Sequence, residues 1–203
     1  EAVMKRLVER AAAVQMGPAL EEKMVNAADS VMGPVIDKNQ YNKIWNYIDT
    51  AKRAGIKLAY GGDKSLVAHL PKDGNFIPPT IFTDVPTDAA IWREEIFGPV
   101  LSVREFKSEE EALQLANDSS YGLGAAVFSA DAERCERVAR GLRCGIVWKN
   151  CSQPTFIQAP WGGVKQSGFG RELGRWGLEE FTSVKQVTGC ANDFNWGLWM
   201  SKI

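Results

Sequence analysis

Histidine and cysteine are scarce in this sequence. The 203 residues include one histidine, His69, and four cysteines. A single histidine excludes a histidine-rich metal site and a histidine triad built from this chain alone. The cysteines form no Cys-x-x-Cys pair and are too few for a disulfide scaffold, which is typical of a reducing compartment. We therefore expect no metal site.

Excess charge and long apolar runs are also missing. The 24 basic residues nearly balance the 25 acidic ones, so the net charge is −1 and the pI is about 6.0. This balance gives no electrostatic reason to bind nucleic acid or an anionic membrane. No apolar run approaches the ~20 residues that a membrane-spanning helix needs. We expect neither nucleic acid nor a membrane as a partner.

The chain does contain a stretch rich in glycine and aromatic residues, Cys144–Gly174. It begins with a short apolar run, Ile146–Trp148, which predicts a strand. The glycines and prolines that follow are typical of a loop whose backbone turns sharply or lies close to another group. Its large aromatic side chains argue against disorder, because they seek burial. Composition alone is compatible with either a functional loop or a packed crossover loop.

Alternating strand and helix signals predict the fold class. The predicted strands are Val100–Phe106, Gly122–Ser129 and Cys144–Trp148. Between them, Ser108 and Glu111 form a capping box for one helix, and Asp131 can cap a second helix that carries Cys135 on its inner face. Strands that alternate with helices favour parallel pairing through helical crossovers. The sequence therefore predicts an α/β fold.

The N-terminal half gives similar local signals. Ala2–Val14 has the apolar spacing of an amphipathic helix. A second helix is predicted over Gln40–Ala54, with Asp37 as its N-cap and Gly55 as its end. Phe76–Phe82 is predicted to be extended. Because it contains two consecutive prolines, we expect it at a sheet edge or in irregular structure.

Three strings occur in a fixed order: "EEIFGPV" at Glu94–Val100, "YGLGAAVFS" at Tyr121–Ser129 and "APWGGVKQSGFGRELG" at Ala159–Gly174. Together they resemble the aldehyde dehydrogenase superfamily. The longer string "NCSQPTFIQAPWGG" resembles the plant betaine aldehyde and aminoaldehyde dehydrogenases. The resemblance implies that residues 1–180 are the C-terminal part of the α/β catalytic domain. Residues 181–203 would then form an oligomerisation strand and a tail.

The resemblance also implies that other parts of such an enzyme lie upstream. Members of the family are much longer, and Glu1 stands where a methionine would start the chain. The nucleotide-binding domain, the nucleophilic cysteine and the general-base glutamate would all precede this segment. Cys151 lies beside the expected substrate funnel, where neighbouring Lys149 and Asn150 could raise its reactivity, but we expect a structural thiol. We assign no catalytic residue to this chain and expect it to be inactive alone.

By resemblance, five residues belong to binding sites. Glu95 would contact the ribose hydroxyls beside the nicotinamide of NAD, and Phe97 would pack against that ring. Trp161 would form a wall of the aldehyde tunnel and attract a cationic amine group. Ile146 would pack behind Trp161 and favour aminoaldehydes over betaine aldehyde, and Thr155 would also lie on the funnel. The residues alone also allow Glu95 to cap a turn and Phe97 to be a core residue.

The expected function is NAD-dependent oxidation of an aminoaldehyde or betaine aldehyde to the acid, as part of a full-length enzyme. The alternative is a non-catalytic module that pairs with full-length subunits. Phe181–Thr188 reads as a strand which, by resemblance, would join a partner's sheet in a homodimer or larger oligomer.

Ser201-Lys202-Ile203 resembles a peroxisomal address, with the cytoplasm as the alternative. Lys149 replaces an expected apolar residue, and would either reach solvent or disturb its strand.

Overall fold

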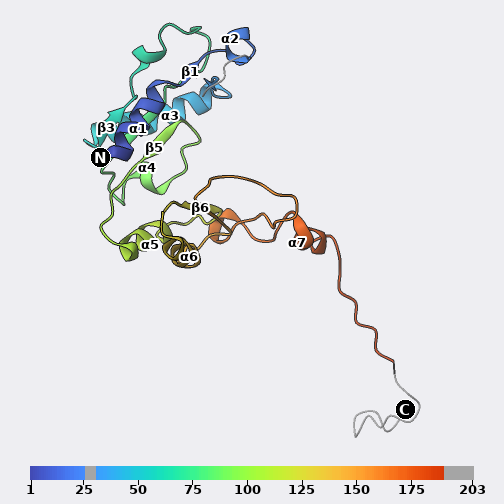
Figure 1. The fold of residues 1–203 in the computed structure, drawn as a ribbon. Coiled ribbons are helices and arrows are strands. Elements are labelled where there is room, and N and C mark those ends of the chain that lie inside the picture. The colour runs from blue at the N-terminus through green and yellow to red at the C-terminus, as the bar shows by residue number, and fades with distance from the viewer. Residues whose placement is uncertain (26–30, 190–203) are drawn as a thin grey trace. The chain divides into compact units, whose positions relative to one another are not determined.

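The computed structural model describes residues 1–25 and 31–189, which belong to two compact units (Figure 1). Unit 1 is Glu1–Ala112, and unit 2 begins at Leu113, so the boundary falls inside helix α5 (Glu109–Asn117). In Figure 1, unit 1 runs from blue α1 to green β5, and unit 2 ends in orange and red after α7. Each unit has its own sheet.

Unit 1 is built on a sheet with strand order β3-β4-β5. The strands are β3 (Lys57–Tyr60), β4 (Thr80–Thr83) and β5 (Val100–Ser102). β3 is antiparallel to β4, with a register irregularity between Leu58 and Tyr60, whereas β4 and β5 are parallel. All four residues of β4 are buried, as a central strand requires.

The expectation of an edge or irregular position is wrong for the second half of Phe76–Phe82. Residues 76–79 have no regular structure, but β4 begins directly after Pro79 and occupies the centre of the sheet. Proline is excluded from central strands because it has no N–H to donate. Here both prolines precede the first paired residue, and the N–H of Thr80 donates to the carbonyl of Pro99 at 2.8 Å.

Helix α3 (Lys38–Arg53) supplies much of the core of unit 1. Its predicted ends are confirmed: Asp37 accepts a hydrogen bond from the N–H of Gln40 at 2.8 Å, and Gly55 follows the helix at φ +73°. Burial of apolar area is the main favourable term in such a core. The core residues are Ile44, Trp45, Ile48, Ala51, Ile77, Phe82, Val85, Ile91 and Ile96.

Shorter elements complete unit 1. They are α1 (Ala2–Ala12), β1 (Gln15–Met16), α2 (Glu22–Val25), β2 (Val31–Met32), the 3-10 helix η1 (Lys64–Val67) and α4 (Ala90–Arg93). β1 and β2 form a parallel pair, and α1 is the predicted N-terminal helix. Among the helices of residues 1–25 and 31–189, none is both long and apolar enough to cross a membrane.

Unit 2 contains the parallel pair of β6 (Gly124–Val127) and β7 (Ile146–Lys149), which α6 (Ala132–Gly141) connects. Asp131 accepts a hydrogen bond from the N–H of Arg134 at 3.0 Å. This bond holds the pKa of Asp131 below its ordinary value and confirms the predicted cap. The parallel strands and helical crossover confirm the α/β fold class.

The predictions for the start of α5 and for the inner face of α6 are also confirmed. Ser108 accepts from the N–H of Glu111 at 3.2 Å, while the Glu111 carboxylate accepts from the N–H of Lys107 at 2.8 Å, a reciprocal cap at the start of α5. Cys135 of α6 is 3% exposed and packs in the interior, as its spacing predicted. The last two helices of the described chain are the 3-10 helix η2 (Lys165–Ser167) and α7 (Gly174–Glu179).

Residues 182–189 have no regular secondary structure. Val184 and Val187 in this segment are exposed. The strand predicted at Phe181–Thr188 would pair with another subunit, so that pairing stays a prediction. The predicted address, Ser201-Lys202-Ile203, lies outside the described residues.

Candidate functional site

A recess of about 560 Å³ lies in unit 2 beside the β6–β7 pair. Side chains alternate between the two faces of a sheet. Because Gly124 pairs with Ile146 and Ala126 with Trp148, these four residues share one face. The recess is lined by Leu123, Gly124, Ala125, Ala126, Trp148, Ser152, Gln153, Thr155 and Trp161. Among residues 1–25 and 31–189, no residue that lines the recess carries a charge, and none is a cysteine or a histidine, so the lining offers aromatic faces, hydroxyl groups and an amide group to a ligand.

Two indoles form one corner of the recess. The ring centroids of Trp148 and Trp161 are 6.1 Å apart, with their planes tilted by 53°. The backbone of Trp161 is fixed by a two-way bridge to Glu172, with both N–H to carbonyl distances at 2.7 Å. Tilted aromatic pairs at this separation are favourable packing partners. The two rings therefore hold each other beside the open space.

The loop after β7 is fixed at its start by Asn150. This residue has φ +54°, a conformation that asparagine tolerates better than most residues. Its amide group accepts from the N–H of Ser129 and donates to the carbonyl of Ser129, both at 2.9 Å. The loop then supplies three lining residues of the recess: Ser152, Gln153 and Thr155.

The far end of the loop is held by close backbone packing. A Cβ placed on Gly145 would lie 1.8 Å from the carbonyl oxygen of Gly162, so only glycine fits there. Arg171 donates to the carbonyls of Gly163 and Gly170 at 2.9 and 2.6 Å. These contacts explain why the stretch needs glycines, and they position the neighbouring Trp161.

Of the three substrate residues expected from the sequence, two line the recess together. Thr155 and Trp161 are both lining residues, but Ile146 is not. Ile146 lies on the same face of the sheet, two positions before Trp148. Its expected packing behind Trp161 stays a prediction. Trp148, for which no site role was predicted, also lines the recess, and its position two residues after Ile146 in one strand was the sequence signal for this.

The nearby ionisable residues lie outside the recess. Lys149 is on the other face of β7, where its ammonium contacts the Glu136 carboxylate at 2.7 Å and lowers the pKa of Glu136. Lys149 does not disturb the strand: its side chain is half exposed and reaches solvent, as the first of the two alternatives predicted, and it pairs there with Glu136. Cys151 is exposed, so the expected packing role does not follow from the structure. Burial raises the pKa of the Cys144 thiol, which keeps it protonated near neutral pH.

In unit 1, the predicted cofactor residues flank a buried anchor. Glu95 and Phe97 are exposed, Phe97 by 68%, whereas Ile96 between them is only 7% exposed. The exposure of Phe97 excludes the alternative in which it is a core residue of this chain. The side chain of Glu95 makes no hydrogen bond or ion pair within the described part of the chain, whereas neighbouring Glu94 accepts from the hydroxyl of Tyr47 at 2.5 Å.

Helix α3 fixes the backbone of this segment. The side-chain amide of Gln40 donates to the carbonyls of Ile96 and Phe97, both at 3.0 Å. Phe97 has φ +56°, an uncommon conformation for an aromatic residue, and the ammonium of Lys43 lies 5.9 Å from its ring centroid. Phe97 therefore presents an exposed ring on a backbone that Gln40 holds in place.

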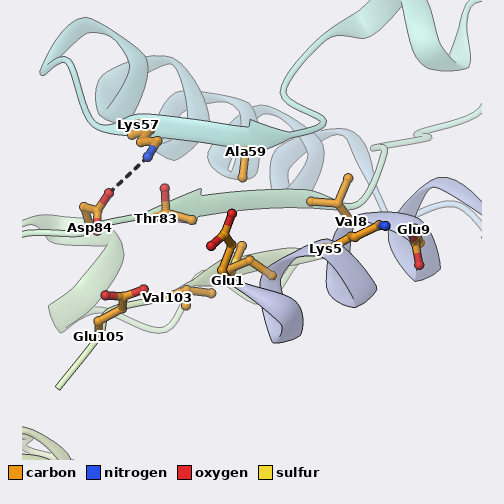
Figure 2. A pocket seen from close by; sticks show the side chains of 11 residues that line it. Glu1, Lys5, Val8, Glu9, Lys57, Ala59, Thr83, Asp84, Val103 and Glu105 are labelled. Atoms are coloured by element: carbon orange, nitrogen blue, oxygen red, sulfur yellow. Dashed lines mark hydrogen bonds and ion pairs between the residues drawn. The ribbon is translucent and has the colours of Figure 1, made fainter. Parts of the chain in front are cut away.

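A second recess, of about 640 Å³, lies between α1 and the sheet of unit 1 (Figure 2). Figure 2 shows Lys57 and Asp84 on one side of it, joined by an ion pair of 3.5 Å, with Lys5 and Glu9 on α1. None of the residues predicted to bind a ligand lies here. No cluster of three or more potential metal ligands occurs in residues 1–25 and 31–189.

Comparison with known proteins gives consistent matches. Residues 1–187 match the model of the aldehyde dehydrogenase family. The peroxisomal aminoaldehyde dehydrogenase 2 of Malus domestica is 54% identical over 198 residues, which cover 98% of this chain and 38% of that protein. The chloroplastic betaine aldehyde dehydrogenase of Atriplex hortensis is 56% identical over 84% of this chain and 33% of its own length.

Solved structures show the same likeness. The crystal structure of a betaine aldehyde dehydrogenase from Staphylococcus aureus in complex with NAD+ matches with a TM-score of 0.77 and 47% identity, over 87% of this chain and 34% of that chain. The chain thus spans about a third of the length of the relatives that it matches.

Proposed function

The chain belongs to the aldehyde dehydrogenase family, and we propose that it forms part of an NAD-dependent enzyme that oxidises an aldehyde with a cationic amine group to the carboxylic acid. The recess of unit 2 carries the proposal for the substrate. Its lining has two indoles and polar oxygens but no charged side chain. An indole face attracts an ammonium group by roughly 0.5–2 kcal/mol, depending on how far water is excluded.

The exposed segment of unit 1 fits the nicotinamide riboside part of NAD. The carboxylate of Glu95 can accept hydrogen bonds from two ribose hydroxyls, and the Phe97 ring offers a flat apolar face to a heterocycle. When bound, NAD accepts the hydride that the aldehyde loses. In this proposal each unit holds one molecule: Gln40 fixes the backbone beneath Phe97 in unit 1, and Trp161 and Thr155 line the recess of unit 2.

The nucleophile and the general base of the proposed reaction belong to parts of a longer protein. We therefore expect no NADH production from the 203-residue chain alone. The test is a chimera in which this chain replaces the matching segment of the Malus domestica aminoaldehyde dehydrogenase 2, to which it is 54% identical. We expect the chimera to reduce NAD in the presence of 3-aminopropionaldehyde. A folded chimera without this activity would overturn the proposal.

A matched pair of variants tests the cofactor residue. In the chimera, Glu95→Gln removes the charge of the carboxylate proposed to accept from the ribose hydroxyls, so the KM for NAD should rise by about fivefold or more. Glu94→Gln changes the neighbouring carboxylate, which is engaged with Tyr47, and should leave that KM within about twofold. Equal effects of the two variants would contradict the assignment of Glu95.

One observation supports the predicted pairing of the C-terminal segment with another subunit. Val184 and Val187 are exposed in a segment without regular structure, so the segment is free to add to another sheet. We propose that residues 181–189 contribute a strand to a homodimer or larger oligomer. Sedimentation of the chain with and without these residues is the test: an unchanged oligomeric state would refute the role.

We also propose a peroxisomal location. The Malus domestica relative is named peroxisomal, whereas the Atriplex hortensis relative is named chloroplastic. Ser201-Lys202-Ile203 is the feature that favours the peroxisome. A fluorescent protein carrying this tripeptide at its C-terminus should enter peroxisomes, and a Lys202→Glu version should stay in the cytoplasm. Cytoplasmic fluorescence from both would refute the address.

A further inference from the structure

Trp148 occupies space that a glycine leaves open. Its indole lies over Gly124 of the neighbouring strand: a Cβ built on Gly124 would be 2.9 Å from Cζ3 and 3.2 Å from Cη2 of Trp148. Gly124 does not have the positive φ that requires glycine. The missing side chain at this position therefore serves to make room for the indole.

The indole of Trp148 also fastens the loop to the sheet. Its Nε1–H donates to the carbonyl of Pro154 at 3.1 Å. Pro154 lies between Gln153 and Thr155, which both line the recess. Trp148 thus holds the middle of the loop, whereas Asn150 holds its start through Ser129.

Trp148 also supports the ring of Trp161. The bridge to Glu172 involves only the backbone of Trp161 and does not by itself set the position of its ring. The ring packs against Trp148, with 6.1 Å between the centroids. One side chain, anchored in β7, therefore contacts both the loop and the second indole.

We propose that Trp148 is the positioning residue of the recess: it holds the Trp161 indole and the Pro154 segment in place and thereby sets the affinity for a cationic head group. This inference rests on the proposed substrate class. Since no charged side chain lines the recess, recognition of a cation depends on the placement of π faces and oxygen dipoles. A small displacement of either indole should lower the affinity for a cation more than that for a neutral molecule of the same shape.

The test uses the full 203-residue chain labelled with ¹⁵N, whose seven tryptophans each give an indole N–H signal. The probes are 3-aminopropan-1-ol, which carries a primary ammonium group, and its neutral isostere butan-1-ol. The variants are Trp148→Phe, which shortens the ring and removes the N–H, and Gly124→Ala, which displaces the indole. The control is Trp176→Phe, at a half-exposed tryptophan of α7 that does not line the recess.

We expect Trp148→Phe and Gly124→Ala to shift the Trp161 indole signal without ligand and to weaken the binding of 3-aminopropan-1-ol by at least about threefold. The preference for 3-aminopropan-1-ol over butan-1-ol should fall in both variants, and Trp176→Phe should change neither the Trp161 signal nor this preference. Gly124→Ala decides the matter if Trp148→Phe does not fold, because the atom that its Cβ meets is the far end of a side chain that can move.

Affinities for 3-aminopropan-1-ol within twofold of the wild type in both variants would overturn the positioning role and leave the proposed function intact. Absence of any effect of 3-aminopropan-1-ol on the wild-type Trp161 signal would also overturn the positioning role, because there would be no cation affinity to set. The proposed oxidation of aldehydes is decided separately, by NADH production in the chimera.

Discussion

Replacing Gly61 by alanine should destabilise unit 1 much more than the same change at Gly55. Both glycines have nearly the same left-handed backbone, with φ +76° and +73°. A Cβ on Gly55 would meet nothing within 4 Å. A Cβ on Gly61 would lie 2.0 Å from the carbonyl oxygen of Pro79 and 2.7 Å from the Cα of Thr80. The pair therefore separates the conformational penalty from the steric one.

The magnitudes follow from the two costs. A left-handed conformation costs alanine about 1–2 kcal/mol, and a less flexible unfolded chain offsets part of that, so Gly55→Ala should lose about 1 kcal/mol. Overpacking costs about 1–3 kcal/mol more. The upper end applies to Gly61→Ala, because Thr80 is 1% exposed in the central strand and its backbone cannot move aside. We expect a difference of about 3 kcal/mol, roughly 100-fold in the unfolding equilibrium.

Amide hydrogen exchange within α3 is the assay, because it reports on unit 1 alone. Slow exchange at the buried Ile48 should be retained in Gly55→Ala and accelerated about 100-fold more in Gly61→Ala. Complete loss of protection in Gly61→Ala would agree with the reasoning. A difference of less than about 0.5 kcal/mol between the variants would refute it, since that is the usual effect of a surface change.

Three further predictions concern unit 2. Gly145→Ala places a Cβ 1.8 Å from the Gly162 carbonyl oxygen, so exchange within α6 should show a loss of about 3 kcal/mol, and a loss under about 0.5 kcal/mol would contradict the packing. The pairing of Glu136 with Lys149 lowers the pKa of Glu136 in the folded protein. The pairing therefore stabilises the fold at pH values above the ordinary carboxyl pKa of about 4.3, and this stabilisation is lost as the pH falls through the lowered pKa of Glu136. Lys149→Met should therefore flatten the dependence of the melting temperature on pH between about 5 and 3, and equal slopes in both proteins would count against the pair. In the chimera, Ile146→Ala should raise kcat/KM for betaine aldehyde relative to 3-aminopropionaldehyde by about fivefold or more, whereas an unchanged ratio would remove Ile146 from the specificity determinants.

Local signals in the sequence were sufficient for the helices and their ends. Asp37, Ser108 and Asp131 each cap the helix that they were predicted to cap, because a cap depends only on residues within one turn. The inward position of Cys135 follows from helical spacing in the same way. Membership of the aldehyde dehydrogenase family was also evident from three short strings, since their order and spacing are specific.

Other features depend on contacts between residues far apart in the chain, and only the tertiary structure decided them. The central position of β4 follows from its pairing with β3 and β5, which the two prolines before it concealed. The positioning role proposed for Trp148 depends on Gly124, Pro154 and Trp161 meeting around one side chain. A sequence shows which residues prefer burial or a turn. The shape of a recess is set by packing among segments that lie far apart in the sequence, and the sequence alone does not show which of these segments meet.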